Sequence, residues 1–133
     1  MNNELNIQTF VQIDFYASMR MYSPEDAINE KNVSKSENYL QSTSDKTEEV
    51  EVSVELELEN GNLSFFARMN NIEPDLIISG GEFTCNIHLF GTSLKKEYVT
   101  EGQTIFFIGN RRIAKGQILE VSNVVEKPII TNT

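Results

Sequence analysis

The feature that most constrains the fold is a strict alternation of apolar and polar residues over positions 49–59, EVEVSVELELE. Valine or leucine occupies every second position, and five glutamates and one serine stand between them. Side chains of a β-strand point alternately to its two faces, so a period of two predicts a half-buried strand with an ionised outer face. Asn60-Gly61 follows directly and predicts a hairpin turn, because both residues tolerate positive φ.

Five further segments have strand character, and helical periodicity is almost absent. The six predicted strands are Leu5–Ala17, Glu49–Glu59, Leu63–Met69, Glu82–Phe90, Thr104–Ile108 and Arg111–Val121. Six short strands separated by turns indicate a sandwich or a barrel, and a closed barrel leaves no exposed sheet edge. We therefore predict an all-β fold, a six-stranded antiparallel, Greek-key-like barrel. Its predicted interior residues are Val50, Val52, Val54, Leu56, Phe83, Cys85, Ile87, Leu89 and Ile113.

The chain length of 133 residues fits one domain, which we place at residues 1–121, followed by a C-terminal tail at 122–133. Within the domain, residues 20–48 form a predicted insertion. Ser23-Pro24-Glu25-Asp26 is typical of a helix start, with a capping serine and a proline at the first position, and it predicts one short helix. Residues 29–48 hold few apolar side chains, so we expect a long, flexible polar loop there.

Gly116 marks a change in the apolar pattern of the last predicted strand. Ile113 and Ile118 are five residues apart, so a regular strand would point them to opposite faces of the sheet. For both to face the core, one residue between them must be left out of the pairing with the neighbouring strand. Glycine at such a slip is typical of a β-bulge. We therefore predict a bulge at Gly116 and poor tolerance of substitution there.

The charge of the chain is negative and unevenly distributed. The net charge is −9, and residues 1–60 alone carry 13 acidic and 4 basic side chains. An acidic surface disfavours binding to phosphate backbones and favours solubility or a basic protein partner. The polar start of the chain is unlike a signal peptide, and no apolar run reaches membrane-spanning length, so we expect a cytoplasmic protein.

Residue sets that support catalysis are missing from the sequence. No phosphate-binding G-x-x-x-x-G-K-[ST] motif is present. Cys85 and the single histidine, His88, lie three residues apart on a predicted strand and should point to opposite faces, so they are unsuited to act as a nucleophile pair. One imidazole without neighbouring ligands is no zinc site. We predict no catalytic residues, no metal and no cofactor.

The segment Glu101–Val121, EGQTIFFIGNRRIAKGQILEV, resembles the end of the third domain of elongation factor Tu and related translation GTPases. In that family a strand, a glycine turn, an arginine and a V-G-x-G motif close a six-stranded barrel; Arg111 and the run Ile113–Gly116 match the last two. Ile77–Glu82 and Leu63–Phe66 resemble two earlier strand motifs of the family. The resemblance implies a stand-alone barrel without the GTPase domain, and the final turn is about two residues shorter than in the family.

Three functional interpretations follow from these features. The first is a non-catalytic protein-binding module, for example an immunity or antitoxin-type protein, whose contact residues would be Glu51, Glu55, Glu57 and Glu59. The second is a translation-related RNA-binding accessory domain, which the resemblance implies because the matching turn lies near transfer RNA. Its contact residues would be Arg111, Arg112 and Lys115. The third is an enzyme, which the missing chemistry makes the weakest of the three.

Overall fold

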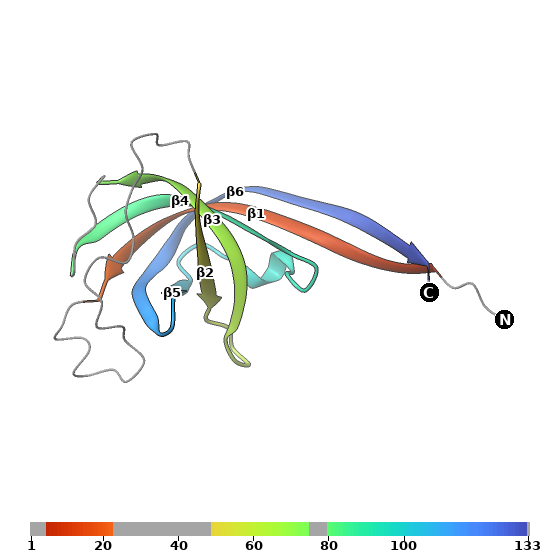
Figure 1. Cartoon of the computed structure of the whole chain (residues 1–133), viewed down its shortest axis with the longest axis horizontal. Coiled ribbons are helices and arrows are strands. Elements are labelled where there is room, and N and C mark those ends of the chain that lie inside the picture. The colour runs from red at the N-terminus through yellow and green to blue at the C-terminus, as the bar shows by residue number, and fades with distance from the viewer. Residues whose placement is uncertain (1–4, 23–48, 75–79, 133) are drawn as a thin grey trace.

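The computed structural model describes residues 5–22, 49–74 and 80–132. It contains six antiparallel strands and one 3-10 turn, η1 (Lys96–Tyr98). The strands are β1 (Leu5–Met21), β2 (Val50–Leu56), β3 (Leu63–Glu73), β4 (Glu82–Gly91), β5 (Thr104–Ile108) and β6 (Arg112–Asn132). They close into a barrel in the order β1-β4-β3-β2-β5-β6, which confirms the predicted six-stranded antiparallel barrel (Figure 1).

The topology is a Greek key. β2, β3 and β4 follow one another as neighbours, and β1 lies beside β4, so β1 reaches its place through the long connection to β2. The predicted short helix and the polar loop at 29–48 both fall in that connection and lie outside the described residues. β6 pairs with both β5 and β1 and so closes the ring.

The interior of the barrel is filled by side chains from all six strands. Residues of one parity on each strand point inward, as in β2, where Val52, Val54 and Leu56 are buried. Eight of the nine predicted interior residues are buried, and Val50 is half-buried against the core. Phe83 and Phe107 meet in the core with 6.1 Å between ring centroids. None of the described polar or charged residues is buried.

The predicted second strand is shorter in the structure than in the sequence pattern. β2 ends at Leu56, so Glu57 and Glu59 follow the strand instead of extending its outer face. Leu56 pairs with Leu63, and the connection between β2 and β3 therefore spans residues 57–62 and is longer than a two-residue hairpin turn. Gly61 has φ +124°, which supports the predicted role of glycine in this turn.

The predicted bulge at Gly116 is wrong, because this residue pairs regularly with Met19 on β1 and Ile105 on β5. The irregularities lie on either side of it. Ile113 is left out of the pairing with β5, whereas Leu119 and Ser122 are left out of the pairing with β1. The bulge at Ile113 produces the change of apolar parity between Ile113 and Ile118, and the φ angle of Gly116 is not positive.

The last strand does not end at Val121, so the predicted separate tail at 122–133 differs from the structure. β6 continues to Asn132 and pairs with β1 as far as Leu5. β4 joins β1 only from Val11 onward, so residues 5–10 and 127–132 form a two-stranded arm that projects from the barrel (Figure 1). The exposed apolar side chains of this arm include Ile7, Ile129 and Ile130.

Candidate functional site

A binding site has to lie on the outer wall of the barrel, because the interior is filled by side chains. One row of outward-facing residues crosses four neighbouring strands and is largely apolar. We call it the outer row: Phe90 on β4, Phe66 on β3, Ser53 on β2 and Ile108 on β5. Ser53 pairs with both Phe66 and Ile108, so these three side chains are immediate cross-strand neighbours.

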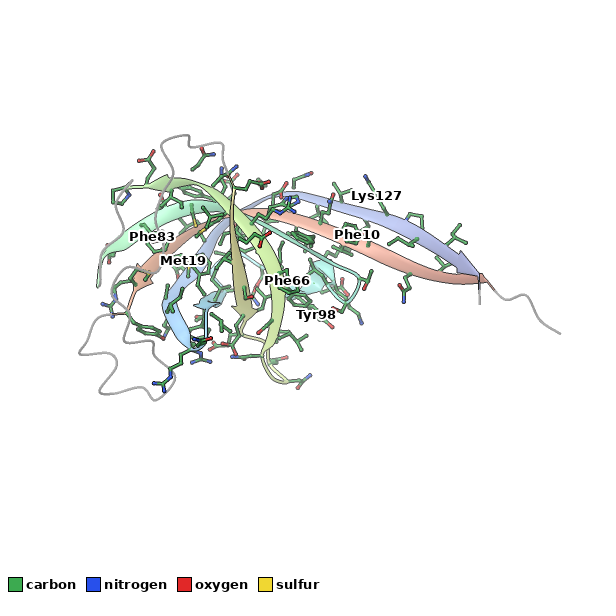
Figure 2. The ribbon with its side chains drawn as sticks, in the orientation of Figure 1. Phe10, Met19, Phe66, Phe83, Tyr98 and Lys127 are labelled. Carbon is green, nitrogen blue, oxygen red and sulfur yellow. The ribbon has the colours of Figure 1, made fainter. Side chains whose placement is uncertain are left out.

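Phe66 is the most exposed large apolar side chain in the described part of the chain, at 75% exposure (Figure 2). A depression lies on each side of its ring. The first, of about 400 Å³, is shared with Phe90 and lined by small and hydroxyl-bearing residues of the β4–η1 connection. The second, of about 330 Å³, has an apolar floor that includes Val52, Ile108 and Ile113, and Glu51 is its one charged lining residue. Phe66 therefore separates a neutral depression from an apolar one with a single carboxylate.

A second outward-facing aromatic, Phe106 on β5, is covered. The guanidinium of Arg112 lies over its ring, with the Cζ atom 3.7 Å from the centroid, and Phe106 is only 3% exposed. Arg112 Nε donates to Glu55 Oε1 at 3.0 Å, and Asn62 Nδ2 donates to the other carboxylate oxygen of Glu55 at 3.2 Å. The Glu55–Arg112–Phe106 stack thus joins β2, β5 and β6 on the outer wall.

The two residue sets predicted for protein and RNA binding therefore meet in one ion pair. Glu55 is not part of a free acidic row, since its side chain is 17% exposed and bonded to Arg112. Glu51, Glu57 and Glu59 are exposed and form no ion pair within the described ranges. Arg111 and Lys115 are exposed, and Lys115 lies 5.9 Å from the Phe106 ring. Sequence reasoning missed this pairing, because only the strand order brings residues 55 and 112 together.

The stack yields a stability prediction with a matched control. Arg112→Ala removes the charge-assisted hydrogen bond to Glu55 and uncovers Phe106, so we expect a loss of about 1–3 kcal/mol in the free energy of unfolding. Arg111→Ala, at the neighbouring exposed position, should change it by less than about 0.5 kcal/mol. Urea denaturation of both variants measures the difference. Equal stabilities would mean that the stack contributes nothing.

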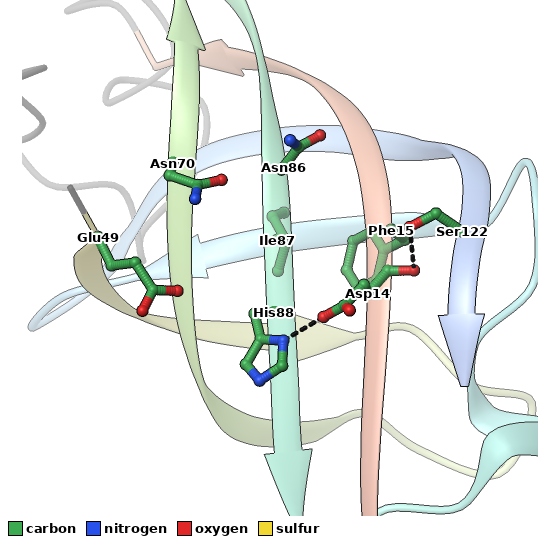
Figure 3. Close-up of a pocket in the computed structure, with 8 residues that line it drawn as sticks. All are labelled: Asp14, Phe15, Glu49, Asn70, Asn86, Ile87, His88 and Ser122. Atoms are coloured by element: carbon green, nitrogen blue, oxygen red, sulfur yellow. Dashed lines mark hydrogen bonds and ion pairs between the residues drawn. The ribbon is translucent and has the colours of Figure 1, made fainter. Parts of the chain in front are cut away.

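A polar pocket of about 400 Å³ opens on the same wall, over β1, β4 and β3 (Figure 3). His88 Nδ1 contacts Asp14 Oδ1 across the β1–β4 pair, and Glu49, Asn70, Asn86 and Ser122 also line the pocket. Ser122 donates its hydroxyl to the backbone oxygen of Asp14 at 3.1 Å. The sequence offered no signal for the Asp14–His88 contact, since the residues are 74 positions apart.

The chemical capacity of this pocket is limited. The Asp14–His88 contact fixes the orientation of the imidazole ring, and His88 also packs against Phe90 with centroids 5.9 Å apart. The hydroxyl of Ser122 is directed to the backbone oxygen, so its bond does not connect it to the imidazole. No group of three or more potential metal-ligating side chains occurs in residues 5–22, 49–74 and 80–132. A cross-strand pair that orders the wall accounts for these contacts.

A third aromatic of the wall, Phe90, also lies near a guanidinium, but at a greater distance than Phe106. Arg68 Cζ lies 5.7 Å from the ring centroid of Phe90. The guanidinium also approaches Glu49, with 3.7 Å between Nη1 and Oε1. Both partners of this ion pair are well exposed, so it is the weaker of the two arrangements.

Cys85 lies on the opposite face of β4 from His88, as predicted. It is fully buried among apolar residues, whereas His88 is half-buried on the outer wall. Burial raises the pKa of the Cys85 thiol to about 12. A buried thiol with a raised pKa is a poor nucleophile, because the reactive form is the thiolate.

The described residues contain no helix that is both long enough and apolar enough to span a membrane. No protein-family model, curated protein or solved structure matches this chain.

Proposed function

We propose that this chain is a non-catalytic protein-binding module that binds its partner on the outer wall of the barrel. The observation that carries the proposal is Phe66, a 75% exposed aromatic ring between two depressions. Exposed aromatic side chains beside apolar pockets are typical of the few residues that dominate binding energy in protein interfaces. Contact with a partner would remove this exposed apolar ring from water, which favours binding.

The partner of this module is basic in our proposal. The chain carries a net charge of −9, and Glu51, next to the outer row, is exposed and forms no ion pair within the described residues. Opposite charges accelerate encounter and suppress wrong partners, so association should slow as salt is added. An immunity or antitoxin-type protein, which neutralises a basic protein by covering it, is one form that such a module would take.

The RNA-binding interpretation has less support from the wall. Of its three candidate residues, Arg112 donates to Glu55 and stacks on Phe106, so a phosphate would have to compete with a bonded carboxylate. The exposed residues Arg111 and Lys115 supply only two cations, which give little affinity at physiological salt. The resemblance to the third domain of elongation factor Tu supports the barrel and supplies no further RNA contact.

Site-specific crosslinking tests the proposed function. A photoreactive phenylalanine analogue at position 66 should capture a protein from extracts of the native cell. The same analogue at exposed Gln117, on β6 opposite β3 in the ring, should not capture it. With the captured partner purified, Phe66→Ser should weaken binding by roughly thirtyfold, the size of a hot-spot residue.

Two results would contradict the proposal. Capture of the same proteins from positions 66 and 117 would show that the label reports collisions instead of a site. Capture of RNA at position 66 would favour the RNA-binding interpretation, and the Arg111→Ala variant should then weaken that binding as well.

A further inference from the structure

Three outward-facing phenylalanines, on β3, β4 and β5, are each associated with an acidic side chain of residues 49–55, either directly or through an arginine. Phe106 pairs with Glu55 across β5 and β2, Phe90 is linked to Glu49 through Arg68, and Phe66 lines the same depression as Glu51. Glu51 is diagonal to Phe66 in the β2–β3 register, within reach of a long side chain that contacts both. An aromatic ring and a carboxylate are thus associated at three places on these strands, at one of them only through an arginine.

In the first two cases an arginine of the chain completes the arrangement. Arg112 lies over Phe106 and donates to Glu55, and Arg68 lies near Phe90 and pairs with Glu49. A guanidinium suits this place because its planar face stacks on a ring while its edge donates to a carboxylate. The better-formed stack leaves Phe106 only 3% exposed.

No arginine within residues 5–22, 49–74 and 80–132 lies between Phe66 and Glu51. No cation contacts the ring of Phe66 there, and Glu51 forms no ion pair. Arg68, which pairs with Glu51 in the strand register, is directed to Glu49 and the Phe90 ring. What remains is a depression with an apolar floor, an aromatic wall and one unpaired carboxylate.

We infer that this depression receives an arginine side chain from the partner protein. The methylene stem would pack on Val52, Ile108 and Ile113, and the guanidinium would stack on Phe66 and donate to Glu51. The inference rests on the proposed function and adds the chemistry of the recognised residue. Lysine fits less well, since a compact, strongly hydrated ammonium neither stacks on the ring nor forms a bidentate bond.

Titration with a single amino-acid probe tests the depression without knowledge of the partner. Amide spectra of the protein labelled with ¹⁵N would be recorded with N-acetyl-arginine N-methylamide and with the citrulline equivalent, its neutral isostere. We expect millimolar binding of the arginine probe, with shifts confined to residues 50–53, 66, 108, 109 and 113, which line the depression. The citrulline probe should bind roughly fivefold more weakly, because it lacks the charge.

Three variants define the site. Glu51→Gln removes the carboxylate charge, and Phe66→Leu keeps apolar area but removes the ring face, so each should reduce arginine binding to the level of citrulline. Glu120→Gln, at an exposed position on β6, removes an equal charge elsewhere and should leave binding unchanged. The unbound spectrum of each variant verifies its fold.

The outcomes separate this inference from the proposed function. Equal shifts with arginine and citrulline, or unchanged binding by Glu51→Gln, would overturn the arginine site, while a partner crosslinked at position 66 would still support protein binding. Selective arginine binding with no partner captured at position 66 would support the site and count against the proposed function.

Discussion

Gly116→Ala should reduce the free energy of unfolding by about 3 kcal/mol or more, or prevent folding altogether. A Cβ atom at this position would lie 2.0 Å from the backbone oxygen of Ser18, 2.5 Å from Met19 Sδ and 2.8 Å from Met19 Cα. Two of these three atoms belong to the backbone of β1, so relief requires the β1–β6 pair to separate. Overpacking typically costs about 1–3 kcal/mol, and a clash with backbone exceeds that range.

Gly91→Ala on β4 is the matched control. The added Cβ meets only Phe65 Cδ1, at 3.9 Å, and the φ angle of Gly91 is not positive. This variant should stay within about 0.5 kcal/mol of the parent protein in urea denaturation. A Gly116→Ala variant as stable as Gly91→Ala would show that β1 and β6 are not packed as closely as the structure has them.

Alkylation of Cys85 by iodoacetamide should be at least about a thousandfold slower in the folded protein than in urea. Burial raises the pKa of the thiol from 9.0 to about 12, which lowers the thiolate fraction near neutral pH by about that factor. Full burial of the side chain adds a steric barrier. Mass spectrometry over time measures the rate, and equal rates in both conditions would contradict the buried position of Cys85.

The same thiol makes the free energy of unfolding depend on pH in the alkaline range. The pKa of Cys85 is higher in the folded state, so the folded protein binds this proton more tightly than the unfolded chain does. The contribution of the thiol to the free energy of unfolding is complete below pH 9 and declines towards pH 12, with a slope of at most about 1.4 kcal/mol per pH unit. Cys85→Ala should show a correspondingly flatter decline over this range, and an identical pH profile would contradict the assignment.

The alternation in the sequence was sufficient to predict an all-β fold and most of its core, and the avoidance of exposed sheet edges favoured a barrel over a sandwich. Residues 50–56 face the interior at every second position, and the pattern of β4 places Cys85 inside and His88 outside, as expected. These predictions succeed because a period of two follows from the geometry of a strand and does not depend on its neighbours. Strand ends were less predictable, since they depend on pairing partners such as the β1 residues that hold β6 as far as Asn132.

The sequence pattern and the structure both single out Gly116, but for different physical reasons. The change of apolar parity between Ile113 and Ile118 is real, but the bulge that causes it lies at Ile113. Gly116 is needed because β1 approaches β6 closely at this point. A parity change shows that a residue is left out of a ladder, but its position depends on the register of the opposite strand.

The candidate site could be predicted only in fragments. Two adjacent phenylalanines on a strand must face opposite sides, so either Phe65 or Phe66 had to point outward, and the structure places Phe66 there. The sequence did not reveal that Glu55 is bonded to Arg112, or that Glu51 is left beside an uncovered ring. These relations arise from the order β3-β2-β5-β6, which no local pattern contains.

Closure of the ring by its first and last strands has a kinetic consequence. The pairs β2–β3 and β5–β6 join segments close in sequence, and loop closure for such pairs costs little entropy. β1 pairs with β4 on one edge and with β6 on the other, so the edge that faces β6 stays unpaired until the final strand has been synthesised. On a ribosome the barrel therefore stays open until β6 emerges, and folding should take milliseconds to seconds, as in other proteins dominated by distant pairings.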